Sequence, residues 1–99
     1  MRSLARQAGD AARHLKLLGN KKRLLILCFL AARGEMTVGD MLDVIDISPS
    51  ALSQHLAKLR GDGLVTYRRT AQTLHYRVAD PRTLRVLDVL KQIYCENLR

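Results

Sequence analysis

The chain has 99 residues, with 17 Lys or Arg against 9 Asp or Glu, and a formal net charge of +8. Its apolar share of 47%, with 2 Pro and 6 Gly, is not that of a disordered or fibrous protein. The longest apolar run, Leu24–Ala32, has nine residues, whereas a membrane span needs about 20. Residues 1–12 are basic but lack the apolar centre of a secretory signal. We therefore expect one small cytoplasmic domain whose positive charge suits a polyanion, first of all nucleic acid.

Two helices are predicted in the first third of the chain. Apolar residues at helical spacing predict a helix over residues 3–18, which Gly19 ends. A second helix is predicted from about Asn20 to Arg33, with Gly34 after it. One stripe of this second helix follows the i, i+3, i+4, i+7 spacing of a core-facing side. We expect the core to take up this stripe, which consists of Leu24, Leu27, Cys28 and Ala31.

Two further helix starts follow. The segment Thr37–Asp40 resembles a capping box, with a hydroxyl at the cap and a carboxylate three residues later. It predicts a short helix that ends near Val44–Ile45. Ser48–Pro49 is a cap followed by Pro at the first helical position, where the missing N–H does no harm. The helix that starts there is predicted to run to Arg60 and to be stopped by Gly61–Gly63.

The period of the pattern then changes from 3.6 to 2. Apolar and polar residues alternate over residues 65–67 and 74–78, which predicts a two-stranded hairpin within residues 64–79. Its turn, Thr70–Gln72, contains no Gly, so we expect a loop longer than two residues. Asp80–Pro81 starts a last helix over about residues 82–97. Four helices, a hairpin and a fifth helix predict a mainly α fold with a β-hairpin: a winged helix-turn-helix within one domain, residues 1–99.

The helix at residues 48–60 has the composition of a DNA-recognition helix. A helical wheel places Leu52, Leu56 and Leu59 together as its buried stripe. The opposite face and its flanks carry Ser50, Gln54, Ala57, Ser53 and Lys58. Gln pairs with adenine, Ser meets several base edges, and Lys meets phosphate. Ser48 and the first-turn N–H groups suit a further phosphate. The alternative is an ordinary amphipathic helix with a solvated face, which the neighbouring capped helix and hairpin disfavour.

The hairpin provides a second candidate contact. Arg68 and Arg69 precede its turn, Gln72 and Thr73 lie at it, and Arg77 follows. A basic tip beside a recognition helix would reach the minor groove or the DNA backbone; the alternative is a solvated charged turn. His55 is interpreted as a polar contact or a packed residue rather than a metal ligand. The candidate DNA contacts are thus Ser48, Ser50, Ser53, Gln54, His55, Lys58, Arg68, Arg69, Gln72 and Thr73.

The segment Ile47–Val65 resembles the recognition segment of the ArsR/SmtB family of bacterial winged-helix repressors. Lys22–Leu27 looks like the second helix of that family, and Gln72–Arg77 looks like its wing, so the resemblance covers essentially the whole chain. It implies a homodimer joined through the helices at residues 3–18 and 81–97. Two recognition helices would then enter successive major grooves of an inverted-repeat operator. One departure is Pro49, where many relatives carry a polar residue, often Gln.

The metal sites of this family are not matched. Its thiolate site uses Cys-x-Cys in the third helix, where this chain has Thr37 and Gly39. Its other common site uses His on the last helix, and residues 80–97 contain no His. Zinc normally takes four ligands, and two thiols are too few. We expect no metal and no cofactor.

The remaining candidates for an inducer site are Cys28 and Cys95, which we expect to be reduced. Their positions resemble the dithiol subgroup of the family, the BigR, SqrR and HlyU group, which responds to reactive sulfur species or oxidants. The resemblance implies that the two thiols become linked, directly or through sulfur atoms, and that operator affinity falls. The wheel places Cys95 outside the apolar arc of the last helix, one turn after Lys91, which favours thiolate. We therefore predict that Cys95 reacts first and that Cys28, on the core stripe, resolves.

Three alternatives stay open at this stage. The first alternative is a constitutive DNA-binding regulator without an inducer, in which both cysteines are small core residues. A second alternative is an unusual thiolate metal sensor that uses Cys28, Cys95 and a histidine such as His14. An enzyme is the least expected, because the sequence has no paired carboxylates, nucleophile–base arrangement or Gly-rich phosphate loop.

Overall fold

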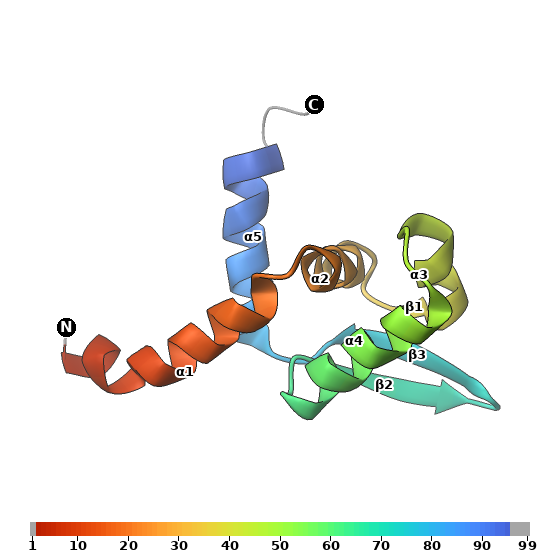
Figure 1. The fold of residues 1–99 in the computed structure, drawn as a ribbon, viewed down its shortest axis with the longest axis horizontal. Helices are drawn as coiled ribbons and strands as arrows, with labels where there is room; N and C mark the ends of the chain where they lie inside the picture. Colours follow the sequence, from red (N-terminus) through yellow and green to blue (C-terminus); the bar gives the residue numbers. More distant parts are fainter. Residues whose placement is uncertain (1, 96–99) are drawn as a thin grey trace.

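The computed structural model describes residues 2–95 and shows the expected winged helix-turn-helix (Figure 1). In chain order its elements are α1 (Arg2–Leu18), α2 (Lys21–Arg33), β1 (Met36–Thr37), α3 (Val38–Val44), α4 (Pro49–Gly61), β2 (Val65–Thr70), β3 (Thr73–Val78) and α5 (Pro81–Cys95). The five predicted helices and the hairpin are confirmed. The predicted last turn of the final helix, residues 96–97, lies outside the described residues.

Side chains at the helix starts accept hydrogen bonds from backbone N–H groups, and the sequence predicted the one at Thr37 but not the one at Asn20. The Asn20 side chain accepts hydrogen bonds of 3.1 Å from the N–H groups of Lys22 and Arg23 at the start of α2. Thr37 and Asp40 form the predicted capping box on α3, with bonds of 3.0 and 3.1 Å. Each cap replaces a partner that the first turn of a helix lacks, which fixes where the helix begins.

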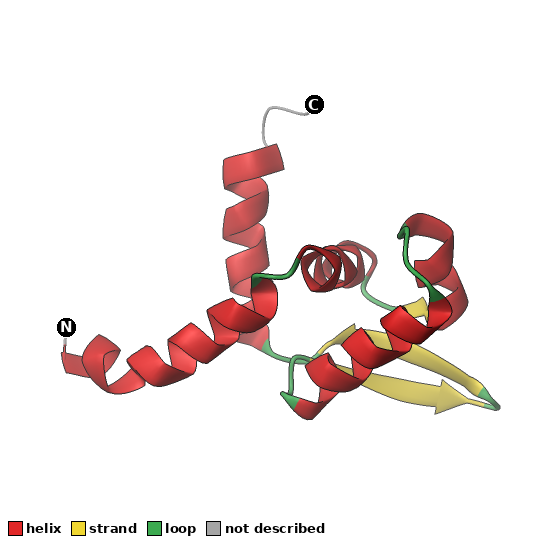
Figure 2. Ribbon diagram, in the orientation of Figure 1, coloured by secondary structure: helices red, strands yellow, loops and turns green. Residues whose placement is uncertain are grey.

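The sheet has three strands rather than the two predicted. All pairs are antiparallel and the order is β1-β3-β2 (Figure 2). In the register of the new strand, Met36 lies opposite Tyr76 and Thr37 opposite His75. A strand of two residues is too short to show alternation, so the sequence pattern did not reveal it. Its effect is to tie the segment after α2 to the hairpin.

The expectation of a long hairpin loop is wrong. Thr70 pairs with Thr73, which leaves only Ala71 and Gln72 as the loop. Tight hairpin turns need positive φ, which Gly adopts without strain. Here Ala71 adopts φ 55° in place of a Gly. The pairing of the two strands therefore outweighs the preference of the turn residue.

The core lies between the helices and one face of the sheet. The predicted α4 stripe of Leu52, Leu56 and Leu59 is buried, as expected. The predicted α2 stripe is right in part: Leu27 is buried, and Leu24 and Ala31 pack against the core, but the other buried residues of α2 are Ile26 and Leu30. Leu24 and Ala31 are half-buried and Cys28 is exposed. Because α2 is apolar on several sides, more than one stripe fits helical spacing, and only packing against α4 and β3 selects among them.

The helices α1 and α5 project from this body, and the molecule measures 47 × 34 × 21 Å (Figure 1). Two contacts join them. His14 Nε2 and the fully buried Thr83 Oγ1 share a hydrogen bond of 2.8 Å, and Arg82 pairs with Asp10 at 3.0 Å. None of the helices in residues 2–95 is long and apolar enough to cross a membrane.

Candidate nucleic-acid interface and thiol pair

The outward face of α4 is polar and free of acidic residues along its length. Ser50, Ser53, Gln54 and Lys58 are exposed, and His55 is half-buried. At the helix start, Ser48 Oγ accepts a hydrogen bond of 3.2 Å from the N–H of Ala51. The predicted outward face is therefore confirmed as a surface, with hydroxyl and amide groups near the helix start and a cation one turn before its end.

Aromatic contacts hold the far end of α4 against the wing. The guanidinium of Arg60 lies 4.4 Å from the ring centroid of Tyr67 in β2. Tyr67 in turn meets Tyr76 of β3 edge-on, with ring centroids 5.3 Å apart. A cation over an aromatic face is attracted by the ring, and T-shaped aromatic pairs are favourable. These contacts, which sequence reasoning missed, set the position of the recognition helix relative to the hairpin.

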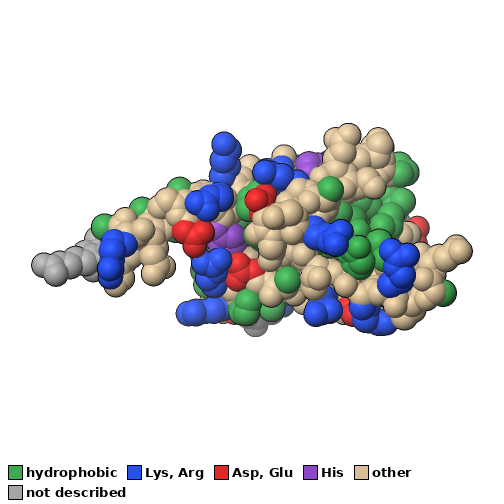
Figure 3. Space-filling view, turned by 90° about the horizontal axis from the view of Figure 1, so that it is seen from below, with side chains coloured by type: hydrophobic (Ala, Val, Ile, Leu, Met, Phe, Trp, Pro, Cys, Tyr) green, Lys and Arg blue, Asp and Glu red, His purple; other side chains and the backbone are tan. Residues whose placement is uncertain are grey.

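The hairpin carries the predicted polar and basic side chains, with Arg77 further from its turn than the others. Arg69, Gln72, Thr73 and Arg77 are exposed. The surface seen from the side of the sheet bears Lys and Arg side chains along its length, with fewer Asp and Glu (Figure 3). Exposed guanidinium and hydroxyl groups on a hairpin beside a polar helix suit phosphate and base edges at once.

Arg68 differs from the other wing residues, because it is held by Glu35. Its Nε donates to both carboxylate oxygens, at 3.1 and 2.9 Å, and its Nη2 donates to Oε1 at 2.9 Å. The hydrogen bonds from Arg68, and after them its charge, hold the pKa of Glu35 below its usual range, so this carboxyl is ionised at neutral pH. Glu35 lies 33 residues away in sequence, and no sequence signal joins the two.

Both thiols are free and exposed, so the interpretation of both as core residues is wrong. The prediction that Cys28 belongs to the core stripe fails for the same reason. The two cysteines line one groove of about 560 Å³ between α2 and α5. Partial burial raises the pKa of the Cys28 thiol, and the neighbouring Cys95 raises that pKa further. The fold therefore brings together two thiols that are 67 residues apart in sequence.

The groove is mostly apolar. From α2 it is lined by Leu24, Cys28, Ala31 and Ala32, and from α5 by Leu84, Leu87, Asp88, Leu90, Lys91, Tyr94 and Cys95. Cys95 and Lys91, which the sequence places one turn apart, therefore lie on the side of α5 that faces the groove, together with Leu84 and Asp88. His14 is not part of it and bonds Thr83 instead. Within residues 2–95, no three His, Cys, Asp or Glu side chains come together in a way that would hold a metal ion.

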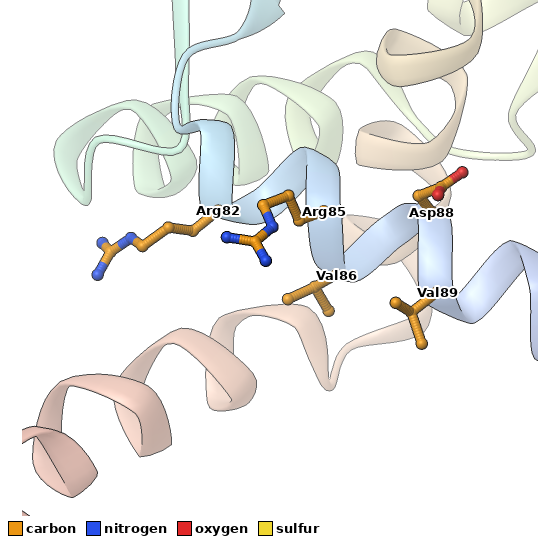
Figure 4. Close-up of a pocket in the computed structure, with 5 residues that line it drawn as sticks. All are labelled: Arg82, Arg85, Val86, Asp88 and Val89. Carbon is orange, nitrogen blue, oxygen red and sulfur yellow. The ribbon is translucent and has the colours of Figure 1, made fainter. Parts of the chain in front are cut away.

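Another side of α5 lies next to α1. A hollow of about 520 Å³ is lined by Arg82, Arg85, Val86, Asp88 and Val89. Figure 4 shows Val86 and Val89 pointing to the side where α1 lies, while Asp88 points away from them. Val89 is 50% exposed, and Ile93 and Tyr94 further along α5 are 63% and 74% exposed. The helix thus keeps a large apolar surface that the rest of residues 2–95 does not cover.

Comparison with known proteins identifies the family. Residues 20–67 match the family model described as "Bacterial regulatory protein, arsR family". The transcriptional activator HlyU of Vibrio cholerae is 38% identical over 97% of this chain and 88% of its own length. The chain belongs to the ArsR family. As a member of that family it is a DNA-binding transcriptional regulator and not an enzyme.

Solved structures agree with this assignment. The transcriptional regulator HlyU from Vibrio vulnificus is 39% identical, with a TM-score of 0.87 over 95% of this chain and 97% of that one. The transcriptional repressor BigR from Xylella fastidiosa is 32% identical, with a TM-score of 0.88 over 95% of both chains. The winged helix of this ArsR-family protein therefore matches those of known regulators from α1 to α5.

Proposed function

We propose that this ArsR-family protein is a cytoplasmic, homodimeric repressor that binds an inverted-repeat operator and is released by thiol chemistry between Cys28 and Cys95. The inducer would be a reactive sulfur species or an oxidant. The observation that carries the proposal is the pair of free, exposed thiols in one groove between α2 and α5. The structural relatives HlyU and BigR, whose dithiol subgroup the sequence resembles, support it.

The proposed DNA contacts come from α4 and the wing. Ser48, Ser50 and the first-turn N–H groups would hold a phosphate, because the N-terminus of a helix is positive. Ser53 and Gln54 would read base edges in the major groove, with His55 at its margin, and Lys58 would meet the backbone. Arg69, Gln72 and Thr73 would contact the adjacent backbone or minor groove.

The proposed dimer rests on the exposed apolar residues of the two projecting helices. Leu4 and Leu15 of α1 are 57% and 60% exposed, and Ile93 and Tyr94 of α5 are more exposed still. Soluble monomers rarely leave such a surface open to water. A second copy would cover it by pairing the same helices about a two-fold axis. The two α4 helices would then be held about one turn of DNA apart.

The proposed switch reaction can be written in two steps with a persulfide, R–S–SH, as the inducer. The Cys95 thiolate attacks the outer sulfur and becomes a persulfide, and the thiol R–SH leaves. The Cys28 thiolate then attacks the Sγ of Cys95. A Cys28–Cys95 disulfide forms and hydrogen sulfide leaves with both electrons. The raised pKa of Cys28 supports Cys95 as the first nucleophile, since the thiolate is the reactive form. Further persulfide would place additional sulfur atoms in the bridge.

The helix α2 connects the thiols to the DNA-binding elements. It packs against α5 on one side and against α4 and β3 on the other. At its start, Lys22 Nζ donates a hydrogen bond to the backbone carbonyl of Asp46, in the turn between α3 and α4. A covalent bridge between α2 and α5 would therefore alter how the dimer presents α4. A coupling of about 1–3 kcal/mol changes affinity roughly 5–150-fold, which is enough for regulation.

The test uses a duplex selected from random sequence by the reduced protein. Its affinity is measured for wild type, Cys28→Ser and Cys95→Ser, each reduced or treated with glutathione persulfide. We expect treated wild type to lose affinity and dithiothreitol to restore it, with both variants unresponsive. Persulfide treatment that leaves wild-type affinity unchanged would mean a constitutive regulator. Stoichiometric zinc binding that releases DNA would instead mean a metal sensor.

The order of the two steps has its own test. After limited persulfide treatment, mass spectrometry of Cys28→Ser should find added sulfur on Cys95, whereas Cys95→Ser should be modified slowly. Predominant modification of Cys28 in Cys95→Ser, with Cys95 inert in Cys28→Ser, would reverse the order and leave the switch itself intact.

A further inference from the structure

One carboxylate lies among the cations on the outer face of the sheet. Gly34, at φ 85°, ends α2 and turns the chain so that Glu35 directly precedes β1. The pairing of Thr37 with His75 fixes β1 beside β3. The three strands themselves contain no acidic residue. Asp40 also lies near His75, but its carboxylate is held by the capping box of α3, and Glu35 is the carboxylate that bonds a basic side chain of the wing.

Arg68 reaches this carboxylate across the middle strand. It lies in β2 opposite His75 of β3, and β3 separates β2 from β1. Arg68 and Glu35 then meet through the three hydrogen bonds described above. Besides Arg68, which has the largest effect, the charges of His75 and Arg77 also lower the pKa of Glu35. The carboxylate thus faces three basic side chains of the wing and is bonded to one of them.

A guanidinium in this geometry is a poor phosphate contact. The Nε and Nη2 donors form one of the two edges of the guanidinium that can bind a carboxylate or a phosphate through two bonds, and Glu35 already occupies that edge. The pair as a whole is also electrically neutral, so it releases fewer counterions on binding DNA than a free arginine would. Arg69, Gln72 and Thr73, nearer the hairpin end, have no such partner among the described residues.

We propose that Glu35 limits the affinity of this regulator for DNA by holding Arg68 away from phosphate. While Glu35 holds it, Arg68 does not contact DNA, and it becomes free to bind phosphate only when that bond is broken. Release of this residue would strengthen binding to any duplex, because phosphate contacts carry no sequence information. The inference rests on DNA contact by the wing and not on the thiol switch, so every measurement uses reduced protein.

The test is a double-mutant cycle on the full chain. Affinity for the selected duplex and for one of unrelated sequence is measured from about 50 to 200 mM salt for wild type, Glu35→Gln, Arg68→Ala and the double variant. Glu35→Gln should bind both duplexes about threefold tighter or more, with a log–log salt slope steeper by about one per wing. The gain should vanish in the double variant. Arg68→Ala should cost more in the Glu35→Gln background than in the native one.

Two controls separate this mechanism from others. Asp43→Asn removes the same charge from an exposed position on α3 and should leave the slope unsteepened. Arg69→Ala should weaken binding, which establishes that the wing contacts DNA. Suppose that Arg69→Ala weakens binding, but that Glu35→Gln and a second variant, Glu35→Ala, bind DNA no more tightly than wild type. This result would overturn the inference about Glu35 and leave the proposed wing contact intact. No effect of Arg69→Ala would overturn both it and the proposed wing contact.

Discussion

Residues 21–79 and the two flanking helices bury their apolar side chains to very different degrees. The body formed by residues 21–79 holds most of the core, with Ile26, Leu27, Met41, Leu52 and Leu59 fully buried. Among the described residues, Val38 is the only large exposed apolar side chain of the body. Those of α1 and α5 are Leu4, Leu15, Leu84, Val89, Ile93 and Tyr94. The body therefore buries nearly all of its large apolar side chains, whereas the two helices leave several of theirs exposed to solvent.

The difference assigns separate tasks to the two regions. The body carries the outward polar face of α4 and the wing, while α1 and α5 carry the apolar surface that is proposed to bind a second copy. The thiol groove lies where α2 of the body meets α5. A reaction at this junction would therefore change how the two bodies of the proposed dimer are arranged, without unfolding either of them.

The largest effect is expected from a charge placed on the apolar face of α5, which tests whether this face forms the dimer interface. Ile93→Lys should convert the proposed dimer to monomer, because a two-fold interface loses the side chain twice and each copy contributes about 1.5–3 kcal/mol. Sedimentation equilibrium measures the change. Val38→Lys, an exposed apolar position of the body, is the matched control and should stay dimeric. A dimer that survives Ile93→Lys would show that α5 does not form the interface.

The body should respond to a core truncation instead. Leu52→Ala removes a fully buried side chain of α4 and should lower the free energy of unfolding by about 2–5 kcal/mol. Urea denaturation gives the value. Ser53→Ala, on the exposed side of the same helix, should change stability by no more than about 0.5 kcal/mol. Equal effects of the two variants would contradict the assignment of the α4 faces.

The outward face of α4 can be tested for base reading. Gln54→Ala should cost about 1–3 kcal/mol of discrimination at one base pair and relax the sequence preference there. Lys58→Ala should weaken binding to all sequences alike and make the salt slope shallower by less than about one, because Lys58 already pairs with Asp62 at 3.3 Å. Competition binding with single-base operator variants measures both. A Gln54→Ala variant that weakens all duplexes equally would make this residue a backbone contact.

The link between α1 and α5 is the next test. Thr83→Val keeps the shape of a fully buried side chain but removes the hydroxyl that bonds His14. Because His14 is half-buried and can still reach water, the loss of unfolding free energy should be about 1 kcal/mol. Thermal denaturation at fixed protein concentration provides the measurement. No loss at all would show that this contact does not hold the two helices together.

The smallest effect concerns the thiols themselves. Burial raises the pKa of Cys28, and the charge of Cys95 raises it further. Cys95→Ser removes only the second cause, so the pKa of Cys28 should fall while staying above that of a thiol fully surrounded by water, because Cys28 remains partly buried. The alkylation rate of Cys28 against pH, followed by mass spectrometry, should shift to lower pH in the variant. A shift to higher pH would contradict the proximity of the two sulfur atoms.

The sequence predicted the features that depend on local chemistry. Thr37 with Asp40 and Ser48 with Pro49 placed two helix starts correctly, because a cap and its backbone partners lie within one turn. The α4 stripe was found because polar residues separate Leu52, Leu56 and Leu59. The outward side chains of α4 followed directly from that stripe.

The features that the sequence did not predict depend on contacts between distant segments. In α2 the apolar residues surround the helix, so the pattern could not show that Cys28 is exposed. The strand β1 forms only because β3 lies beside it, and Ala71 adopts a turn conformation that the strand pairing imposes. The bond between Glu35 and Arg68 joins the residue before β1 to β2, across β3. Each of these depends on tertiary packing rather than on the spacing of residues along the chain.

The central claim is that a bridge between α2 and α5 releases DNA. The most direct measurement is the operator affinity of one preparation in three states: reduced, bridged by persulfide with the bridge confirmed by intact mass, and reduced again. The account predicts an affinity loss of roughly 5–150-fold in the bridged state and full recovery on reduction. A fully bridged protein that binds the operator as tightly as the reduced protein would contradict it.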